Sequence, residues 1–211
     1  MADYKKPDYW QQKARKENYP ARSVYKLQEI EEKHSLFKFK HLNCLKILDM
    51  GAAPGSWSLY VLRKMKKNNW LNQGFLTAAD LSPLSREFDS GLFDHQNFFF
   101  IQGDFTSLEV RESILGKGPY SLILSDAAPA TTGNHTVDAA RSLDLAETVL
   151  NYAENALNGG GNLVLKIFQG GDSASLLKKM KTLFKTAKSF KPQACRGEST
   201  ETYYIGLDRN T

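Results

Sequence analysis

Short apolar segments alternate with stretches of helical periodicity along most of the chain. The apolar segments have the length of strands and occur at 45–50, 74–80, 97–105, 120–126 and 162–168, and two further strands are predicted at 188–192 and 202–207. Most of them are continuously apolar, which is typical of parallel strands buried on both faces. The pattern therefore predicts an α/β fold with a single doubly wound, mostly parallel sheet of seven strands.

Apolar residues spaced three or four positions apart predict helices between these strands. The predicted helices occupy 5–18, 21–34, 55–67, 107–115, 137–157 and 172–185, and 82–96 is predicted as a loop with a helical turn. Gly159, Gly160 and Gly161 are expected to stop the longest helix, and Asp172 is expected to cap the next one. No repeat or linker divides the sequence, so we expect one domain over residues 1–211.

A turn of small residues, Gly-Ala-Ala-Pro-Gly-Ser, joins the first apolar strand to its helix shortly after Asp49. Gly51 and Gly55 carry no Cβ, so a nucleotide can approach backbone amides at the N-terminus of the helix. The turn departs from the G-x-G-x-x-G of dinucleotide-binding proteins, because Ala53 and Ser56 replace two of its glycines. A carboxylate before the turn suits a cationic amine, which points to S-adenosylmethionine. An ordinary strand–helix turn without a ligand is the alternative.

Four predicted strands end in an aspartate, at Asp49, Asp80, Asp104 and Asp126. Ligands of open α/β sheets bind outside the carboxyl ends of the strands, so these acids should surround one cleft. Asp80 closes the second strand, where an acid is placed to bind a ribose diol. One such aspartate is commonly a turn former, but four in succession favour a ligand site.

The net charge of +5 is concentrated near the N-terminus. Residues 1–46 contain eleven Lys and Arg against six acids, and this difference equals the net charge of the chain. A second basic stretch, 178–196, contains seven Lys and Arg and no acid. We expect the Lys and Arg of residues 5–40 and 178–196 to form one continuous basic face beside the cleft, which suits a polyanion such as nucleic acid. Ordinary solvated helix faces are the alternative.

Several classes of protein are disfavoured by the same sequence. It has no run of about 18 apolar residues that could span a membrane, and residues 1–18 lack the apolar core of a signal peptide. Two cysteines, Cys44 and Cys195, are too few for a disulfide framework and fit a reducing compartment. They form no C-x-x-C pair and the histidines are scattered, so we expect no metal site. A cytoplasmic protein without membrane contact is expected.

Lys166 interrupts the apolar segment 162–168. Lysine is rarely buried without a partner. An edge strand can carry such a lysine to discourage aggregation, but an edge strand would alternate in polarity, and this segment does not. The other interpretation is a functional lysine held by a carboxylate, and a neighbouring cation would make it a better base.

Four charged positions lie in short motifs that occur together in one enzyme family. The motifs are Arg22-Ser-x-x-Lys26, Ser-Asp126-x-x-Pro, Lys166-Ile-Phe-Gln-Gly and Glu201-x-Tyr. With the small-residue turn and the Gly-Asp-Phe at 103–105, they resemble the Lys-Asp-Lys-Glu tetrad and cofactor motifs of the FtsJ-type RNA 2′-O-methyltransferases. The resemblance extends from about residue 9 to residue 207. Within the family, the chain looks most like single-domain enzymes that methylate a uridine ribose of large-subunit ribosomal RNA.

This resemblance implies a Rossmann-like methyltransferase fold, with S-adenosylmethionine as the cofactor. It implies the catalytic residues Lys26, Asp126, Lys166 and Glu201, of which Lys166 would be the base or the cation that stabilises the emerging alkoxide. It implies the cofactor-binding residues Asp49, Gly51, Gly55, Trp57, Asp80, Asp104 and Asp126. Among these, Asp49 would face the methionine amine, Asp80 the ribose hydroxyls and Asp104 the adenine.

The resemblance also implies RNA as the partner, in the large ribosomal subunit or its rRNA. We further expect a monomer, and the charge pattern predicts a basic helical segment at about 1–44. Glu201 is preferred over Glu198 because only Glu201 keeps the spacing to the tyrosine. Other functions stay open. Methylation of transfer RNA or capped RNA uses the same tetrad. A small-molecule methyltransferase would need neither the basic flanks nor two cleft lysines, and a non-catalytic RNA-binding protein need not place lysines at the cleft.

Overall fold

The computed structural model describes residues 8–39, 44–197 and 199–211. Its helices are α1 (Tyr9–Lys16), α2 (Val24–His34), α3 (Ser56–Lys67), the 3-10 turn η1 (Leu92–Asp94), α4 (Leu108–Leu115), α5 (His135–Ala156) and α6 (Ser173–Leu183). Its strands are β1 (Leu45–Met50), β2 (Gly74–Asp80), β3 (Phe98–Gln102), β4 (Tyr120–Ser125), β5 (Leu157–Phe168), β6 (Phe184–Phe190) and β7 (Glu201–Arg209). Parts of the expected N-terminal basic segment, and Glu198, lie outside the described residues.

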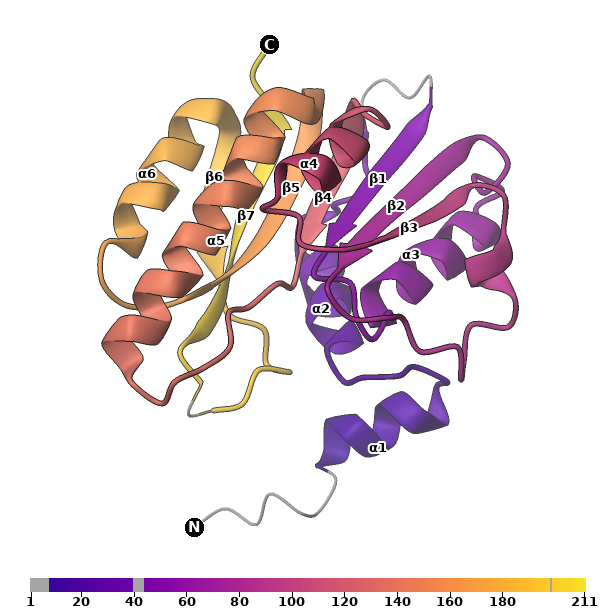
Figure 1. Cartoon of the computed structure of the whole chain (residues 1–211), viewed down its shortest axis with the longest axis horizontal. Helices are drawn as coiled ribbons and strands as arrows, with labels where there is room; N and C mark the ends of the chain where they lie inside the picture. Colours follow the sequence, from indigo (N-terminus) through magenta and orange to yellow (C-terminus); the bar gives the residue numbers. More distant parts are fainter. Residues whose placement is uncertain (1–7, 40–43, 198) are drawn as a thin grey trace.

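The described strands form one seven-stranded sheet in the order β3-β2-β1-β4-β5-β7-β6 (Figure 1). Strands β1 to β5 pair in parallel with their neighbours, and β7 runs antiparallel to both β5 and β6. The chain proceeds outward from β1 to β3 and then returns to the other side of β1 for β4. The strand order therefore reverses between β1 and β4, which is where doubly wound sheets bind ligands. The predicted Rossmann-like sheet is confirmed.

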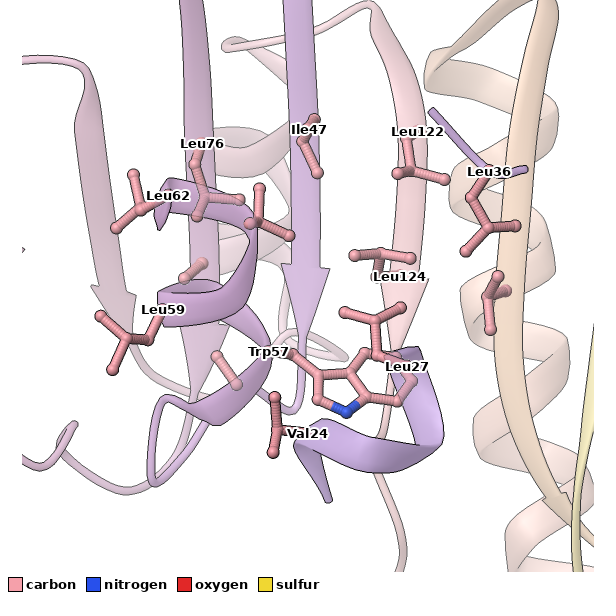
Figure 2. Packing of buried hydrophobic residues seen from close by; sticks show 14 of the residues in the cluster. Val24, Leu27, Leu36, Ile47, Trp57, Leu59, Leu62, Leu76, Leu122 and Leu124 are labelled. Atoms are coloured by element: carbon pink, nitrogen blue, oxygen red, sulfur yellow. The ribbon is translucent and has the colours of Figure 1, made fainter. Parts of the chain in front are cut away.

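Side chains alternate between two apolar layers, one on each face of the sheet. Ile47 of β1 faces the layer that includes α2 and α3, whereas the next residue, Leu48, faces the layer that includes α4, α5 and α6. The first layer is seen in Figure 2, where the labelled side chains are Val24, Leu27, Leu36, Ile47, Trp57, Leu59, Leu62, Leu76, Leu122 and Leu124. Burial on both faces explains why the central strands are continuously apolar.

The glycines at 159–161 do not stop the long helix as expected. Helix α5 ends at Ala156, and β5 begins with the next residue, Leu157. Gly160 has φ +78° and lies where the pairing with β4 shifts register, and a Cβ on Gly161 would lie 2.8 Å from the Leu157 side chain. The glycines therefore form an irregularity inside β5 rather than a helix end.

Two other local expectations are also corrected. Asp172 occupies the N-cap position of α6, but its side chain makes no capping hydrogen bond. The sixth strand begins at Phe184, four residues before the predicted 188, because Asn210 and β7 continue its pairing toward α6.

The basic stretch 178–196 is divided between the two faces of the sheet, so the expected single basic face is wrong in part. Lys178 and Lys181 belong to α6, which packs on the face opposite α2. Lys185 pairs with Asp208 at 3.2 Å. Lys191 faces α2, in a cavity that also includes Lys33. No helix of the described residues is long and apolar enough to cross a membrane.

Candidate active site

The turn between β1 and α3 brings its backbone against the loop that follows β4. Gly51 has φ +73°, and a Cβ on this residue would lie 2.5 Å from the Cα of Ala127. Gly55 has φ +109° and is the N-cap of α3, where a Cβ would lie 2.9 Å from the Phe93 ring. Both positions exclude larger residues, Gly51 because a backbone passes next to it and Gly55 because of its positive φ.

A cavity of about 620 Å³ lies at the carboxyl ends of β1, β2 and β4. It is lined by Gly51, Ala53, Asp80, Leu81, Asp104, Phe105, Thr106, Asp126, Ala127, Ala128, Pro129, Ala130, Arg141, Asp144, Leu145 and Thr148. This position matches the reversal of strand order, and the volume falls within the range of about 300–1,000 Å³ that is usual for cofactor sites. The structure therefore brings three of the four strand-end aspartates to one cavity.

Backbone amides hold Asp80 and Asp104 in place. The Oδ2 of Asp80 accepts a hydrogen bond from the Ala53 amide at 2.9 Å, and its Oδ1 accepts one from the Ser82 amide at 2.8 Å. The Oδ1 of Asp104 accepts from the amide and the hydroxyl of Thr106 at 2.8 and 2.7 Å, and these bonds lower the pKa of Asp104. Each carboxylate oxygen can accept more than one hydrogen bond, so Asp80 can still accept hydrogen bonds from the hydroxyl groups of a ligand.

Three of the residues expected at the cofactor do not line this cavity. Asp49 is fully buried and points toward α3, where its Oδ2 accepts from the Ser58 hydroxyl at 2.6 Å. Trp57 is 2% exposed, and its indole N–H donates to the Ser23 carbonyl at 2.8 Å, which joins α3 to α2 (Figure 2). Gly55 faces Phe93. The sequence pattern located the turn, but it did not show that the side chains of Asp49 and Trp57 face the core layer.

The buried carboxyl of Asp49 carries a large electrostatic cost. Its Oδ1 has no hydrogen-bond partner among the described residues. Burial raises the pKa of Asp49 from 3.8 to about 7, the Ser58 hydrogen bond opposes this shift, and Asp126 and Asp80 add to it. Burial therefore favours the protonated, neutral form of the Asp49 carboxyl.

A second group of charged side chains lies at the same carboxyl end of the sheet, next to Asp126. The ammonium of Lys166 lies 3.0 Å from the Oδ1 of Asp126 and also donates to the Asp126 carbonyl. The ammonium of Lys26 lies 2.5 Å from the Oε1 of Glu201. The hydroxyl of Tyr203 lies 2.6 Å from the Oδ1 of Asp126 and 2.6 Å from the Oε1 of Glu201. We call these five residues the charged array.

The strands explain how residues so distant in sequence meet. Lys166 on β5 is paired in register with Tyr203 on β7, and Glu201 lies two residues before Tyr203 on the same face. β5 lies between β4 and β7 in the sheet, so Lys166 is not an edge-strand lysine. Lys26 reaches the same end of the sheet from α2. All four charged side chains are largely buried, with 9 to 15% of each exposed.

Electrostatic interactions favour the charged forms of Lys26 and Asp126 despite their burial. Burial opposes the charged form of Lys26, but the carboxylates of Asp126 and Glu201 outweigh this effect, so the pKa of Lys26 is raised. Burial likewise opposes ionisation of Asp126, but the cations of Lys166 and Lys26 lower its pKa. Burial and the same two carboxylates raise the pKa of Tyr203 well above 10, so its hydroxyl stays protonated.

The hydroxyl of Tyr203 connects the carboxylates of Asp126 and Glu201, and no sequence motif directly predicts this contact. In the sequence, Tyr203 stands out only as the tyrosine of the Glu201-x-Tyr spacing. The available signal was the strand period of two, which places both side chains on one face. The wall that α5 contributes to the cavity, with Arg141, Asp144 and Thr148, was not anticipated either.

A larger cavity, of about 920 Å³, lies at the opposite end of the sheet, around Lys46, Ser121 and Arg209. It is at the amino ends of β1 and β4, where open α/β sheets do not bind their ligands. Its cations already have partners, because Lys46 donates to two backbone carbonyls and Arg209 to two others. We therefore assign the ligand site to the smaller cavity.

Comparison with known proteins identifies the family. Residues 19–209 match the model of the FtsJ-like methyltransferases. The chain belongs to this family. It is 52% identical over 205 residues to the ribosomal RNA large subunit methyltransferase E of Treponema denticola, an alignment that covers 97% of this chain and 96% of that protein. The protein of the same name from Borreliella afzelii is 43% identical, over 94% of this chain and 96% of that protein.

Solved structures agree with this placement. A crystal structure described as a ribosomal RNA methyltransferase of Plasmodium falciparum superposes with a TM-score of 0.71 at 26% identity, over 90% of this chain and 98% of that one. Human methyltransferase-like protein 13, in complex with S-adenosylhomocysteine, gives a TM-score of 0.56 over 87% of this chain and 81% of that one. At 15% identity the second likeness concerns the fold alone. S-Adenosylmethionine is the cofactor of FtsJ-like methyltransferases, and the acids of the smaller cavity suit its hydroxyl and amine groups.

Proposed function

We propose that this FtsJ-like protein transfers a methyl group from S-adenosylmethionine to a ribose 2′-hydroxyl of large-subunit ribosomal RNA, at a uridine. The observation that carries the proposal is the charged array at the rim of a cavity suited to a nucleoside. The ribosomal substrate is supported by relatives that are up to 52% identical and are named ribosomal RNA large subunit methyltransferase E. The whole chain then works as one methyltransferase domain.

The cofactor would be held by Gly51, Asp80, Asp104 and Asp126, which line the cavity. Asp80 would accept from the ribose hydroxyls, and Asp104 with Phe105 would contact the adenine. S-Adenosylmethionine supplies an electrophilic methyl group when bound. Asp49 would support the turn from behind through its hydrogen bond with Ser58 on α3 rather than contact the cofactor, since its side chain is closed off from the cavity.

Lys166 is the residue that we propose to contact the 2′-oxygen. Its ion pair with Asp126 fixes the ammonium, and a fixed cation would stabilise the negative charge that develops on the 2′-oxygen. The oxygen would gain the methyl group as the carbon–sulfur bond breaks, its proton would pass to solvent water, and S-adenosylhomocysteine would be the leaving product. Lys26, held by Glu201, would supply a second cation that orients the ribose. Holding the oxygen in line with the methyl group is itself a large contribution, because it replaces a random encounter with a fixed geometry.

The test is a methyl-transfer assay with labelled S-adenosylmethionine. Isolated large ribosomal subunits, transfer RNA and capped RNA are incubated separately with the protein, and the modified ribose is mapped. Incorporation at a 2′-oxygen of the large-subunit RNA is expected. Incorporation only into transfer RNA or capped RNA would replace the ribosomal substrate, and RNA binding without incorporation would replace the enzyme by a binding protein.

The ribosomal substrate has consequences for partners and location. We propose that the protein acts as a monomer on the large subunit or its RNA, in the cytoplasm where bacterial subunits are assembled. Bacterial relatives at 41 to 52% identity, each named ribosomal RNA large subunit methyltransferase E, support the ribosomal RNA partner. Sedimentation of the protein alone and with large subunits tests both statements, because a monomer that co-sediments with the subunits is expected.

A further inference from the structure

A surface cavity of about 660 Å³ lies outside the site described above, between α1, α2 and the end of β6. It is lined by Trp10, Lys13, Tyr25, Gln28, Glu29, Glu32, Lys33, Phe190, Lys191 and Gln193. We call it the aromatic groove. Its lining combines three aromatic rings with three lysines, a combination that the methyl-transfer mechanism does not use.

The rings and the ammonium groups are close together. The ammonium of Lys13 lies 4.5 Å from the centre of the Tyr25 ring and 5.4 Å from that of Trp10. The ammonium of Lys33 lies 4.5 Å from the centre of the Phe190 ring. Tyr25 is buried and joins α1 to the core, whereas Trp10 and Phe190 remain half-buried at the groove. Packing alone therefore explains Tyr25 but leaves ring surface on the other two.

The groove shares its walls with the charged array. Tyr25 immediately precedes Lys26 on α2. On the other wall, the carboxylate of Glu29 accepts from the amides of Gln193 and Ala194 at 2.7 and 2.8 Å, which fastens this loop to α2. The same loop continues to Cys195, whose thiol lies 3.6 Å from Glu201. The groove and the charged array are therefore built on the same two elements, α2 and the loop that contains Gln193 and Cys195.

We propose that the aromatic groove binds the unpaired nucleotides next to the target ribose, with bases stacked on Trp10 and Phe190 and phosphates bound by the lysines. This rests on the proposed function. Unpaired bases can stack on aromatic side chains, whereas the bases of a duplex are stacked on each other. Lysines release counterions from the phosphates that they neutralise. Three acids disfavour the phosphates: Glu29, which accepts from two amides, Glu17, which lies 3.9 Å from Lys13, and Glu32, which lines the groove.

Binding of a single-stranded oligouridine to the full chain tests the proposal. Trp10→Ala and Phe190→Ala should each raise Kd about tenfold, within the usual contribution of one stacked base, whereas Trp10→Phe should stay within about twofold of the wild type. Glu32→Gln should lower Kd. The matched control is Phe99→Ala, which removes a half-buried ring with a lysine, Lys117, 3.9 Å from its centre, on the edge strand β3 far from the groove. It should leave Kd unchanged.

A cross-link keeps the proposal testable if a variant fails to fold. Oligouridine that carries 5-bromouridine is irradiated on the wild-type chain, and the cross-linked peptides should contain Trp10 or Phe190. Wild-type Kd in both alanine variants, equal loss in Phe99→Ala, or cross-links only elsewhere would overturn the proposal. So would loss of activity on subunits with unchanged affinity for free RNA, because the occupant would then be a protein. Failure of the proposed function is a separate result, since it would show as absent methyl transfer by the wild type.

Discussion

The two halves of the site are held in different ways. On the cofactor side, Asp80 and Asp104 are fixed by backbone amides within a few residues of the strand ends. On the acceptor side, Lys26, Lys166 and their partners are fixed by one another, and they come from α2, β5, β7 and the end of β4. Locally held side chains should respond to mutation one at a time, whereas the charged array should respond as a unit.

The largest expected effect is the loss of turnover in Lys166→Met. If Lys166 stabilises the reacting oxygen, turnover should fall by about 10²–10⁴-fold, which is the usual contribution of a positioned proton-transfer or charge-stabilising group. Turnover is measured with saturating RNA and cofactor. Because the change leaves the buried carboxylate of Asp126 with fewer partners, the protein should also melt earlier, so the assay is run well below the melting temperature.

The comparison between the two halves is sharpened by a double mutant. Lys26→Met should also reduce turnover, and Lys26→Met with Lys166→Met should lose less than the product of the single losses, because residues that act as one unit are not additive. Cofactor affinity, measured by calorimetry, should be nearly unchanged in all three. Full activity of Lys166→Met would remove the proposed mechanism, and multiplicative losses would mean that the two lysines act separately.

The next largest effect concerns the pH dependence of stability, which the buried carboxyl of Asp49 should cause. The folded pKa of Asp49 is about 7, well above its ordinary value of 3.8, so between these values the folded state holds a proton that the unfolded state has released. Stability should therefore fall as pH rises through this window, by roughly 4 kcal/mol at most, and level off above about pH 7. Asp49→Asn should remove the decline in urea unfolding at different pH values.

A neighbouring acid provides the control for this measurement. Asp104 is exposed, and its pKa is lowered rather than raised. Stability that depends on its charge is lost only as pH falls toward its lowered pKa, so Asp104→Asn should leave the slope between about pH 5.5 and pH 8 unchanged. An unchanged slope in Asp49→Asn would mean that Asp49 is ionised in the folded protein throughout this range.

Cofactor affinity provides the third test. Asp80→Ala should weaken S-adenosylmethionine binding by about 1.5–3 kcal/mol, the range for hydrogen bonds to charged groups. Affinity for RNA should hardly change, since Asp80 lies on the cofactor side. Asp144→Ala removes a carboxylate that α5 contributes to the same cavity and is the control, with a smaller loss of affinity expected. Normal cofactor affinity in Asp80→Ala would mean that Asp80 has only a structural role, through the hydrogen bonds that it accepts from Ala53 and Ser82.

The sequence predicted the cofactor side of the site better than the acceptor side. Strand ends are local signals, so the gathering of Asp80, Asp104 and Asp126 at one cavity could be predicted from apolar runs that end in an acid. Which way a side chain points at such an end depends on the neighbouring layer, and the position of Asp49 in the core could not be derived from the run itself. The charged array joins residues 26 to 203, so spacing alone could not predict it, and the expectation for its four charged members depended on a family resemblance. Lys166 was an exception, because a lone lysine in an apolar strand indicates a buried partner.

The smallest expected effect concerns the divided basic stretch. Removing one lysine–phosphate interaction should flatten the plot of log Kd against log salt by about 0.7 for single-stranded RNA. Lys188 and Lys191 lie near α2, where Lys188 contributes to the field at His34, and replacing both with Ala should reduce the slope by about 1.4 if both bind phosphate. Lys178 and Lys181 lie on α6 across the sheet and are also exposed, so the matched double variant should keep the wild-type slope. Equal slopes in the two double variants would mean that the acceptor side of the site does not determine which face of the protein the RNA follows.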